Sequence, residues 1–121
     1  MIRSTSIALA ALALTGCGLT PASQRTEFAW QSANLIDGVQ TSQWQHNDCQ
    51  EVGAWKAITG PEPTIERTVL ATAINAALHY SITYALDRYD APIGLKRAWA
   101  WTTIGLTTGQ VVRNATLECA R

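Results

Sequence analysis

The sequence has no excess of charge of either sign, since nine Lys and Arg stand against nine Asp and Glu. A surface that binds nucleic acid needs clustered positive charge, so the composition excludes nucleic acid as a partner. The three cysteines form no CxxC pair and have no His at ligand spacing. A structural zinc site is therefore excluded, and no metal or cofactor is predicted. A glycine-rich phosphate loop, an HExxH motif and a nucleophile elbow are missing too, so we predict that the protein is not an enzyme.

The N-terminal segment lacks a hydrophobic run long enough to cross a membrane. The uncharged run from Ile7 to Leu14 follows a single positive charge. It is shorter than the roughly 20 residues of a spanning helix, but the pattern is typical of a secretory signal. Its end, LTGC at residues 14–17, resembles the lipobox of bacterial lipoproteins. The resemblance implies a signal peptide over 1–16 and an acylated Cys17 at the outer membrane or at the periplasmic face of the inner membrane. The alternative is an ordinary signal peptide with an incidental cysteine.

The rest of the chain shows no strand-like alternation beyond four residues and no internal repeat, so the predicted fold class is all-α. A lipidated tether over 17–26 is expected to lead into one three-helix domain over 27–121. The domain is small, and a single hydrophobic core holds a domain of this size with little to spare.

Capping signals and prolines set the expected helix bounds. The first helix is expected over 27–44, with Thr26 as its N-cap. The second has Pro63 in its first turn and stops by Asp90, and the third covers 96–118. A long loop of about 15 residues joins the first helix to the second, and the turn APIGLK joins the second to the third; the three helices are expected to form an up-down-up bundle.

Two cysteines remain after Cys17, and export would place them in an oxidising space where a pair closes. In an up-down-up bundle, Cys49 follows the end of the first helix and Cys119 follows the end of the third. Both then lie at the same end of the bundle, so we predict a disulfide bond between Cys49 and Cys119.

Each predicted helix carries a stripe of hydroxyl and amide side chains at helical spacing. Together with a loop glutamate, the stripes supply a candidate polar site: Asp37, Thr41, Glu51, Asn75, His79, Gln110, Arg113 and Asn114. Segments 68–86 and 98–112 contain no formal charge, although a water-exposed surface would carry Lys and Glu. One interpretation embeds these two segments in a membrane, where the stripes bond between helices. In the other, the stripes are the wet face of a soluble bundle.

The body of the chain, residues 28–114, resembles small helical membrane proteins found in bacteria and their phages. The resemblance is carried by IDGVQT in the first helix, Glu51 ahead of TGPEP, ALHY in the second helix and KRAWAWTTIGLTTGQVVRN in the third. The chain departs from the group where Glu51-Val52-Gly53-Ala54 stands in place of Glu-x-Asn-Pro. The group has no assigned activity, so the resemblance implies a membrane location and no reaction.

These features favour a lipid-anchored, phage-related envelope protein with a structural or interaction role. It would contact the membrane through its anchor and through 68–86 and 98–112, and would meet a protein partner in the envelope. A second hypothesis is a soluble periplasmic binding module tethered by Cys17, with Trp44 or Trp55 lining a groove. A third is a hydrolase in which Asp37 orients His79 as a general base.

Overall fold

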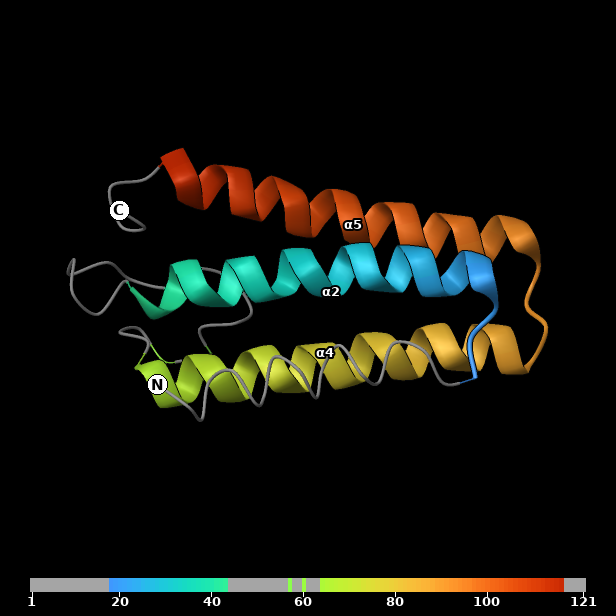
Figure 1. The fold of residues 1–121 in the computed structure, drawn as a ribbon, viewed down its shortest axis with the longest axis horizontal. Helices are drawn as coiled ribbons and strands as arrows, with labels where there is room; N and C mark the ends of the chain where they lie inside the picture. The colour runs from blue at the N-terminus through green and yellow to red at the C-terminus, as the bar shows by residue number, and fades with distance from the viewer. Residues whose placement is uncertain (1–17, 44–56, 58–59, 61–63, 117–121) are drawn as a thin grey trace.

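The computed structural model describes residues 18–43, 57, 60 and 64–116. Three long helices make up most of them: α2 (Pro21–Ser42), α4 (Ile65–Arg88) and α5 (Ile93–Thr116). No strand occurs within the described ranges, so the predicted all-α class with three helices is confirmed. Figure 1 shows the helices side by side with α2 in the middle, and α2 packs against both of the others more extensively than they pack against each other.

The start of α2 differs from the prediction, because the helix begins at Pro21 rather than at residue 27. Pro21 occupies the first turn, where its missing N–H costs nothing. The Thr20 hydroxyl accepts a hydrogen bond from the Ser23 amide at 3.4 Å. Thr26, the expected cap, lies inside the helix, and its hydroxyl donates back to the Ser23 carbonyl at 3.1 Å. The predicted tether is therefore wrong from Pro21 onward, since the Thr-Pro pair starts the helix earlier.

The connection between α4 and α5 is tighter than the sequence indicated. Asp90 adopts a left-handed conformation with φ 51°, and the Ala91 amide donates to the Leu86 carbonyl at 2.9 Å. This pattern is a Schellman-type helix end. The Pro92 carbonyl then accepts from the Lys96 amide at 3.1 Å, so α5 starts directly after Pro92 rather than at Lys96.

The packing of α2 against α4 depends on a glycine. A Cβ atom added at Gly38 would lie 2.5 Å from Thr72 Oγ1 and 3.1 Å from its Cγ2. Contacts that short do not occur in real structures, so only glycine lets the two backbones approach this closely at that level. Small residues play the same role between helices in membranes.

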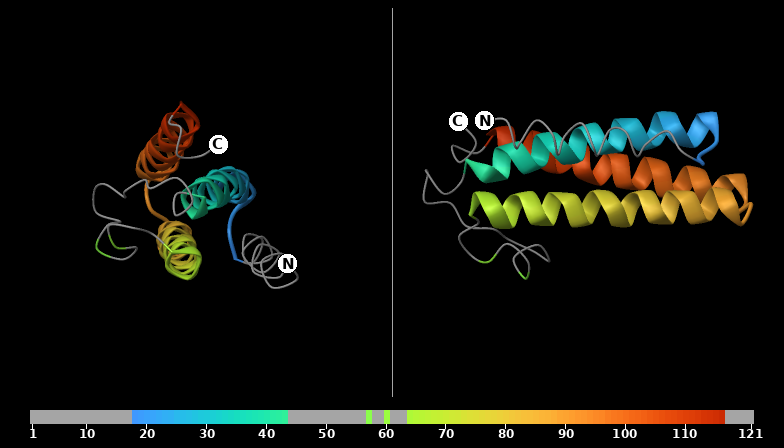
Figure 2. Two further views of the ribbon diagram at one scale, coloured as in Figure 1. Left: turned by 90° about the vertical axis from the view of Figure 1, so that its left-hand side faces the viewer. Right: turned by 60° about the horizontal axis from the view of Figure 1, so that its bottom comes forward.

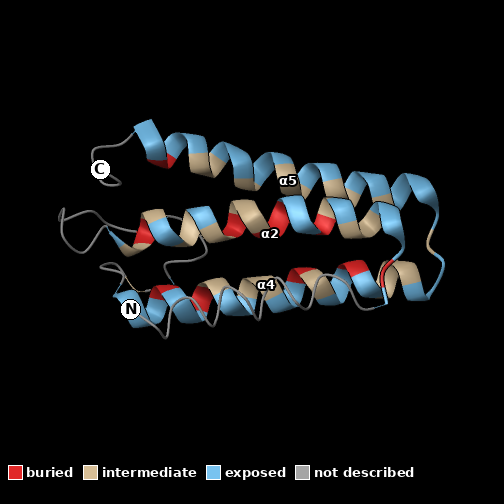
Figure 3. Ribbon diagram, viewed as in Figure 1, coloured by how far each residue is buried: buried red, intermediate tan, exposed pale blue. Residues whose placement is uncertain are grey.

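Figure 3 shows which parts of the helices are buried and which are exposed; most of the buried residues are polar, and many large apolar residues are exposed. Among the described residues, the buried set comprises eight polar residues and three apolar ones, the latter being Leu19, Trp30 and Ala71. The polar members are Glu27, Gln31, Asn34, Thr41, Thr68, His79, Thr83 and Asn114. Sixteen large hydrophobic residues are exposed instead. This distribution is the reverse of the one that water-soluble domains adopt.

Several predictions fall on residues outside the described ranges. These are the signal peptide over 1–16, acylation at Cys17, the Cys49–Cys119 disulfide bond, Glu51, and the tryptophans Trp44 and Trp55. They stay predictions.

Candidate functional site

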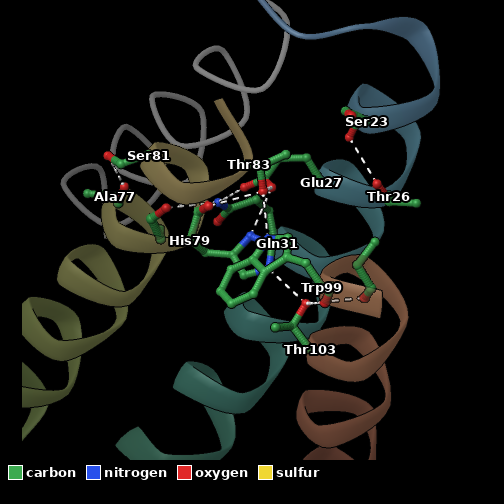
Figure 4. Close-up of polar contacts among 12 residues, drawn as sticks. Ser23, Thr26, Glu27, Gln31, Ala77, His79, Ser81, Thr83, Trp99 and Thr103 are labelled. Carbon is green, nitrogen blue, oxygen red and sulfur yellow. Dashed lines mark hydrogen bonds and ion pairs between the residues drawn. The ribbon is translucent and has the colours of Figure 1, made fainter. Parts of the chain in front are cut away.

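The largest group of interacting polar side chains lies where the three helices meet, nearer the end at which α4 leads into α5. We call it the His79 cluster: Glu27, Trp30 and Gln31 from α2, His79 and Thr83 from α4, and Trp99 and Thr103 from α5. Figure 4 shows most of these side chains converging from the three helices on the imidazole. Each helix supplies its members at a spacing of three or four residues, which places them on one face.

Glu27 is the acceptor at the centre of the cluster, and it is 1% exposed. Its carboxylate accepts hydrogen bonds from Gln31 Nε2 at 2.7 Å and from the Thr83 hydroxyl at 2.8 Å. His79 Nδ1 lies 2.8 Å from Oε2 of the same carboxylate. A buried carboxylate is tolerated only when it is paired and hydrogen-bonded, and Glu27 meets that condition with partners from two helices.

The imidazole of His79 is held on every side. The Trp30 indole stacks on it with ring centroids 3.7 Å apart and planes 5° apart, and Trp99 stacks on it at 4.8 Å and 27°. Its Nε2 lies 2.9 Å from the Thr103 hydroxyl. An ionised carboxylate only accepts, so Nδ1 carries a proton toward Glu27. Nε2 then either accepts from Thr103 or, in the protonated ring, donates to it.

A hydroxyl, an imidazole and a carboxylate in a row are the parts of an acyl-transfer triad, but here the row serves to join helices. The Thr103 hydroxyl also lies 2.8 Å from the Trp99 carbonyl, so its single proton goes either to that carbonyl or to His79 Nε2. Trp99 Nε1 donates to Thr83 at 3.0 Å. An apolar groove of about 390 Å³ in the described part of the chain is lined by Leu78 and Ile82 on α4, among others, and by no member of the cluster. The geometry links α2, α4 and α5 and offers a substrate no entrance from that groove.

A second polar group lies at the opposite end of the bundle. Asn114 is fully buried, and its Nδ2 donates to Asp37 at 2.7 Å. Gln110 donates to Asn114 Oδ1 at 3.0 Å, while Gln40 donates to the Val111 carbonyl at 3.2 Å. These contacts tie the end of α2 to the end of α5.

Between the His79 cluster and this second polar group, amide side chains of α2 donate hydrogen bonds to the middle of α4. Gln31 donates to the Ala76 carbonyl at 3.1 Å, and Asn34 donates to the Thr72 carbonyl at 3.2 Å. Asn75 in turn donates to Asn34 Oδ1 at 2.9 Å. Polar contacts therefore follow the α2 interface from one end to the other.

The structure distributes the predicted site residues over both groups. His79 belongs to the His79 cluster, and Asn75 lies between the groups. Asp37, Gln110 and Asn114 form the second group, Thr41 is buried, and Arg113 is exposed. The pairing of Asp37 with His79 that the hydrolase hypothesis requires is not made: His79 bonds to Glu27, and Asp37 bonds to Asn114. Glu51 lies outside the described residues.

Sequence reasoning missed Glu27, Gln31 and both stacked tryptophans. The signal was present, because the stripe Asn34, Asp37 and Thr41 extends backward by three and then four residues to Gln31 and Glu27. In a helix that begins at residue 27, Glu27 would instead lie in the first turn, where an acidic residue favours the positive end of the helix dipole. Once α2 begins at Pro21, Glu27 moves to the second turn and faces inward.

A third polar contact closes the end of the bundle near the α4–α5 turn. Asp87 accepts from the Thr20 amide at 2.9 Å and from the Ser23 hydroxyl at 2.9 Å, and Lys96 Nζ lies 3.2 Å from it. Burial by itself raises the pKa of the Asp87 carboxyl, but the hydrogen bonds from Thr20, Ser23 and Lys96 outweigh it and hold the pKa below its ordinary value of 3.8. The contact binds the first residues of α2 to the end of α4.

Comparison with known proteins adds no relative. No protein family, curated protein or solved structure matches the chain. Among the described helices, α4 is long and apolar enough to cross a membrane. The core helix of a soluble protein passes the same test but is mostly buried, whereas the apolar window of α4 is 17% buried inside the bundle.

Proposed function

We propose that this protein is a lipid-anchored envelope protein whose three helices form an up-down-up bundle within the cytoplasmic membrane. Its role is structural or interactive: the apolar outer faces of the bundle meet lipid and another membrane protein, and the polar interior holds the helices together. Two observations support the proposal. One is the lipobox-like LTGC at residues 14–17, and the other is the burial of polar residues and exposure of large apolar residues in the bundle.

The observation that carries the proposal is the exposed apolar surface. Leu78 on α4 and Leu106 on α5 are 56% and 71% exposed, and Ile36 and Val39 on α2 are exposed as well. Scattered exposed apolar residues are ordinary, but a surface covered by them marks a membrane or protein contact. In a bilayer, no hydrophobic force draws helices together, so polar side chains and small residues form the interfaces. The His79 cluster and the Gly38–Thr72 contact fit that role.

The length of the charge-free surface also supports the proposal. Residues 68–86 of α4 carry no formal charge and extend about 28 Å at 1.5 Å per residue. In α5, residues 98–112 carry none and extend about 22 Å. After Arg25, the charged residues of α2 are Glu27 and Asp37, both bonded inside the bundle. The charge-free segment of α4 is close to the hydrocarbon thickness of about 30 Å, and that of α5 is shorter.

Extraction after loss of the anchor tests embedding. A Cys17→Ser variant behind a cleavable signal peptide is expressed in a Gram-negative host, and its membranes are washed with alkaline carbonate. We expect the protein to stay in the cytoplasmic membrane pellet. Release into the wash would show that the lipid alone had held the protein, and co-fractionation with the outer membrane would contradict the location. The intact mass of the unaltered protein checks the anchor itself, because an unacylated chain with its leader would remove Cys17 from the proposal.

A matched pair of charge insertions separates lipid from water as the surroundings of α4. Leu78→Arg puts a charge on the outward face at the middle of the charge-free segment, where insertion costs about 2.5 to 3.5 kcal/mol. Tyr89→Arg puts the same charge on the 83% exposed residue that follows α4. We expect Leu78→Arg to reduce the membrane-inserted fraction and Tyr89→Arg to leave it unchanged. Equal insertion of both variants would indicate that this face meets water.

A further inference from the structure

The first described residues are fixed to one end of the bundle. Gly18 has a φ of +84°, and a Cβ atom there would lie 2.8 Å from Cε2 of Tyr84. The next contacts are those of Thr20 and Ser23 with Asp87. Gly18 follows Cys17 directly in the chain, so an acyl group on Cys17 would be attached one residue before this end, where α4 leads into α5.

The side chains around this end have the character of a membrane surface. Tyr89 and Trp101 are 83% and 65% exposed, and the cations Arg25, Arg88 and Arg97 are exposed near them. Tyr and Trp gather at the level of the lipid headgroups, and Arg and Lys near helix ends reach the same level. A diacylated cysteine places its backbone at that level too, because its acyl chains enter the leaflet directly.

We propose that the end of the bundle built by Thr20, Asp87 and Lys96 lies on the periplasmic side, at the membrane surface that holds the acylated Cys17. The opposite end, where Asp37 bonds to Asn114, then lies on the cytoplasmic side. This orientation rests on the proposed function, since it has meaning only for an acylated bundle that crosses the membrane.

The distribution of positive charge permits this orientation. On the Cys17 side lie Arg25, Arg88, Lys96 and Arg97. The other side receives Arg67 and Arg113, and in chain order Lys56 falls between α2 and α4 and Arg121 follows α5, so a spanning bundle would carry four cations toward each side. Lys and Arg orient a membrane protein by their excess in the cytoplasmic loops. With equal numbers at the two ends, the site of acylation decides the orientation.

The orientation changes the expected state of the other two cysteines. Gln43 and Thr116 are the last described residues before Cys49 and Cys119, and both belong to the end opposite Cys17. Cytoplasmic thiols are kept reduced. An acylated Cys17 and a Cys49–Cys119 disulfide bond therefore exclude each other in a bundle that crosses the membrane, and the anchored bundle carries two free thiols.

Site-directed labelling tests the orientation in the full chain. Cys49 and Cys119 are replaced by Ser, and one new cysteine is introduced at an exposed position, by Pro92→Cys at one end or Thr116→Cys at the other. Spheroplasts are treated with a membrane-impermeant maleimide that adds a mass tag, with and without detergent. Intact mass confirms that each variant is acylated at Cys17.

We expect the Pro92→Cys variant to be labelled in intact spheroplasts, and the Thr116→Cys variant to be labelled only after detergent. The reverse pattern would overturn the orientation and leave the spanning bundle in place. Labelling of both variants without detergent, or of neither, would overturn the spanning bundle itself and the orientation with it. Full labelling of both variants in detergent verifies that each reporter is reactive.

Discussion

Removing the carboxylate of Glu27 tests whether the His79 cluster holds the bundle together. Glu27→Ala deletes the acceptor of three contacts, from Gln31 at 2.7 Å, Thr83 at 2.8 Å and His79 at 2.8 Å. All three donors stay buried or partly buried between helices after the change. The cost therefore includes the loss of the contacts and the burial of polar groups without a partner.

The magnitude follows from those contacts. A hydrogen bond between helices in a membrane protein is worth about 0.6 kcal/mol on average, so the two contacts with α4, from Thr83 and His79, give about 1.2 kcal/mol as a lower bound. Removing one partner of a buried charge pair costs about 3 to 5 kcal/mol, which sets the upper bound. At about 1.4 kcal/mol per factor of ten, the ratio of folded to unfolded protein should fall by a factor between about 7 and several thousand.

The assay is unfolding of the purified protein in mild detergent by increasing SDS, followed by far-ultraviolet circular dichroism. The matched control is Phe28→Ala, one residue along α2, because Phe28 is 55% exposed and points outward. We expect this control to change the free energy of unfolding by less than about 0.5 kcal/mol.

A double-mutant cycle with His79→Ala separates pairing from general damage. Since each single variant already breaks the Glu27–His79 contact, the double variant should be less destabilised than the sum of the singles, by about 1 to 3 kcal/mol. Additivity within about 0.5 kcal/mol, or a Glu27→Ala loss no larger than that of Phe28→Ala, would refute a cooperative role for the cluster.

Two further changes probe the packing and the end contact. Gly38→Ala should destabilise the bundle by about 1 to 3 kcal/mol through overpacking against Thr72, and Thr72→Ala should partly rescue it. Gly105→Ala, which meets nothing within 4 Å, should be neutral or slightly stabilising; equal effects in the SDS titration would contradict the close approach. Asp87→Asn should cost about 1 to 3 kcal/mol at pH 7, where the charged carboxylate holds its donors. Because the pKa of Asp87 is lowered in the fold, the stability advantage of Asp87 over Asn should fade as the pH drops below 3.8. A stability difference between the two proteins that stays the same from pH 7 to pH 3 would argue against the contact.

The helical class could be predicted from the sequence because long stretches lack strand alternation and the prolines lie at helix ends. Pro92 correctly marks where the second helix has ended, but the third helix was expected to begin only at Lys96. The sequence does not reveal that the Pro92 carbonyl would accept helical hydrogen bonds at once. At the N-terminus, the sequence predicted Thr26 as the cap, whereas Thr20 caps α2. Part of what holds Thr20 there is Asp87, a residue distant in the chain whose carboxylate accepts from the Thr20 amide.

The sequence predicts which face of each helix a polar residue occupies more readily than it predicts which polar residues bond to each other. Spacing places Asp37, His79 and Asn114 on their inward faces, but it does not give the level at which antiparallel helices meet. Glu27 and Asp37 lie about 15 Å apart along α2 at 1.5 Å per residue, so the level of α2 relative to α4 decides which carboxylate meets His79. The early start of α2 and the contact of Thr20 with Asp87 set that level. Together they place Glu27 within hydrogen-bonding distance of His79, and Asp37 within hydrogen-bonding distance of Asn114.

The reversed polarity also decides what kind of solvent the fold requires. In water, this bundle would expose residues such as Leu106 and bury Glu27, and both choices oppose folding. In a bilayer, the same exposure costs nothing, and an unpaired carboxylate facing lipid is the worse alternative. The contacts around His79 are therefore favourable only where lipid or an apolar partner covers the outer faces. It follows that the helices should separate or aggregate when the purified protein is transferred from detergent to water, although polar side chains bond across the interfaces between them.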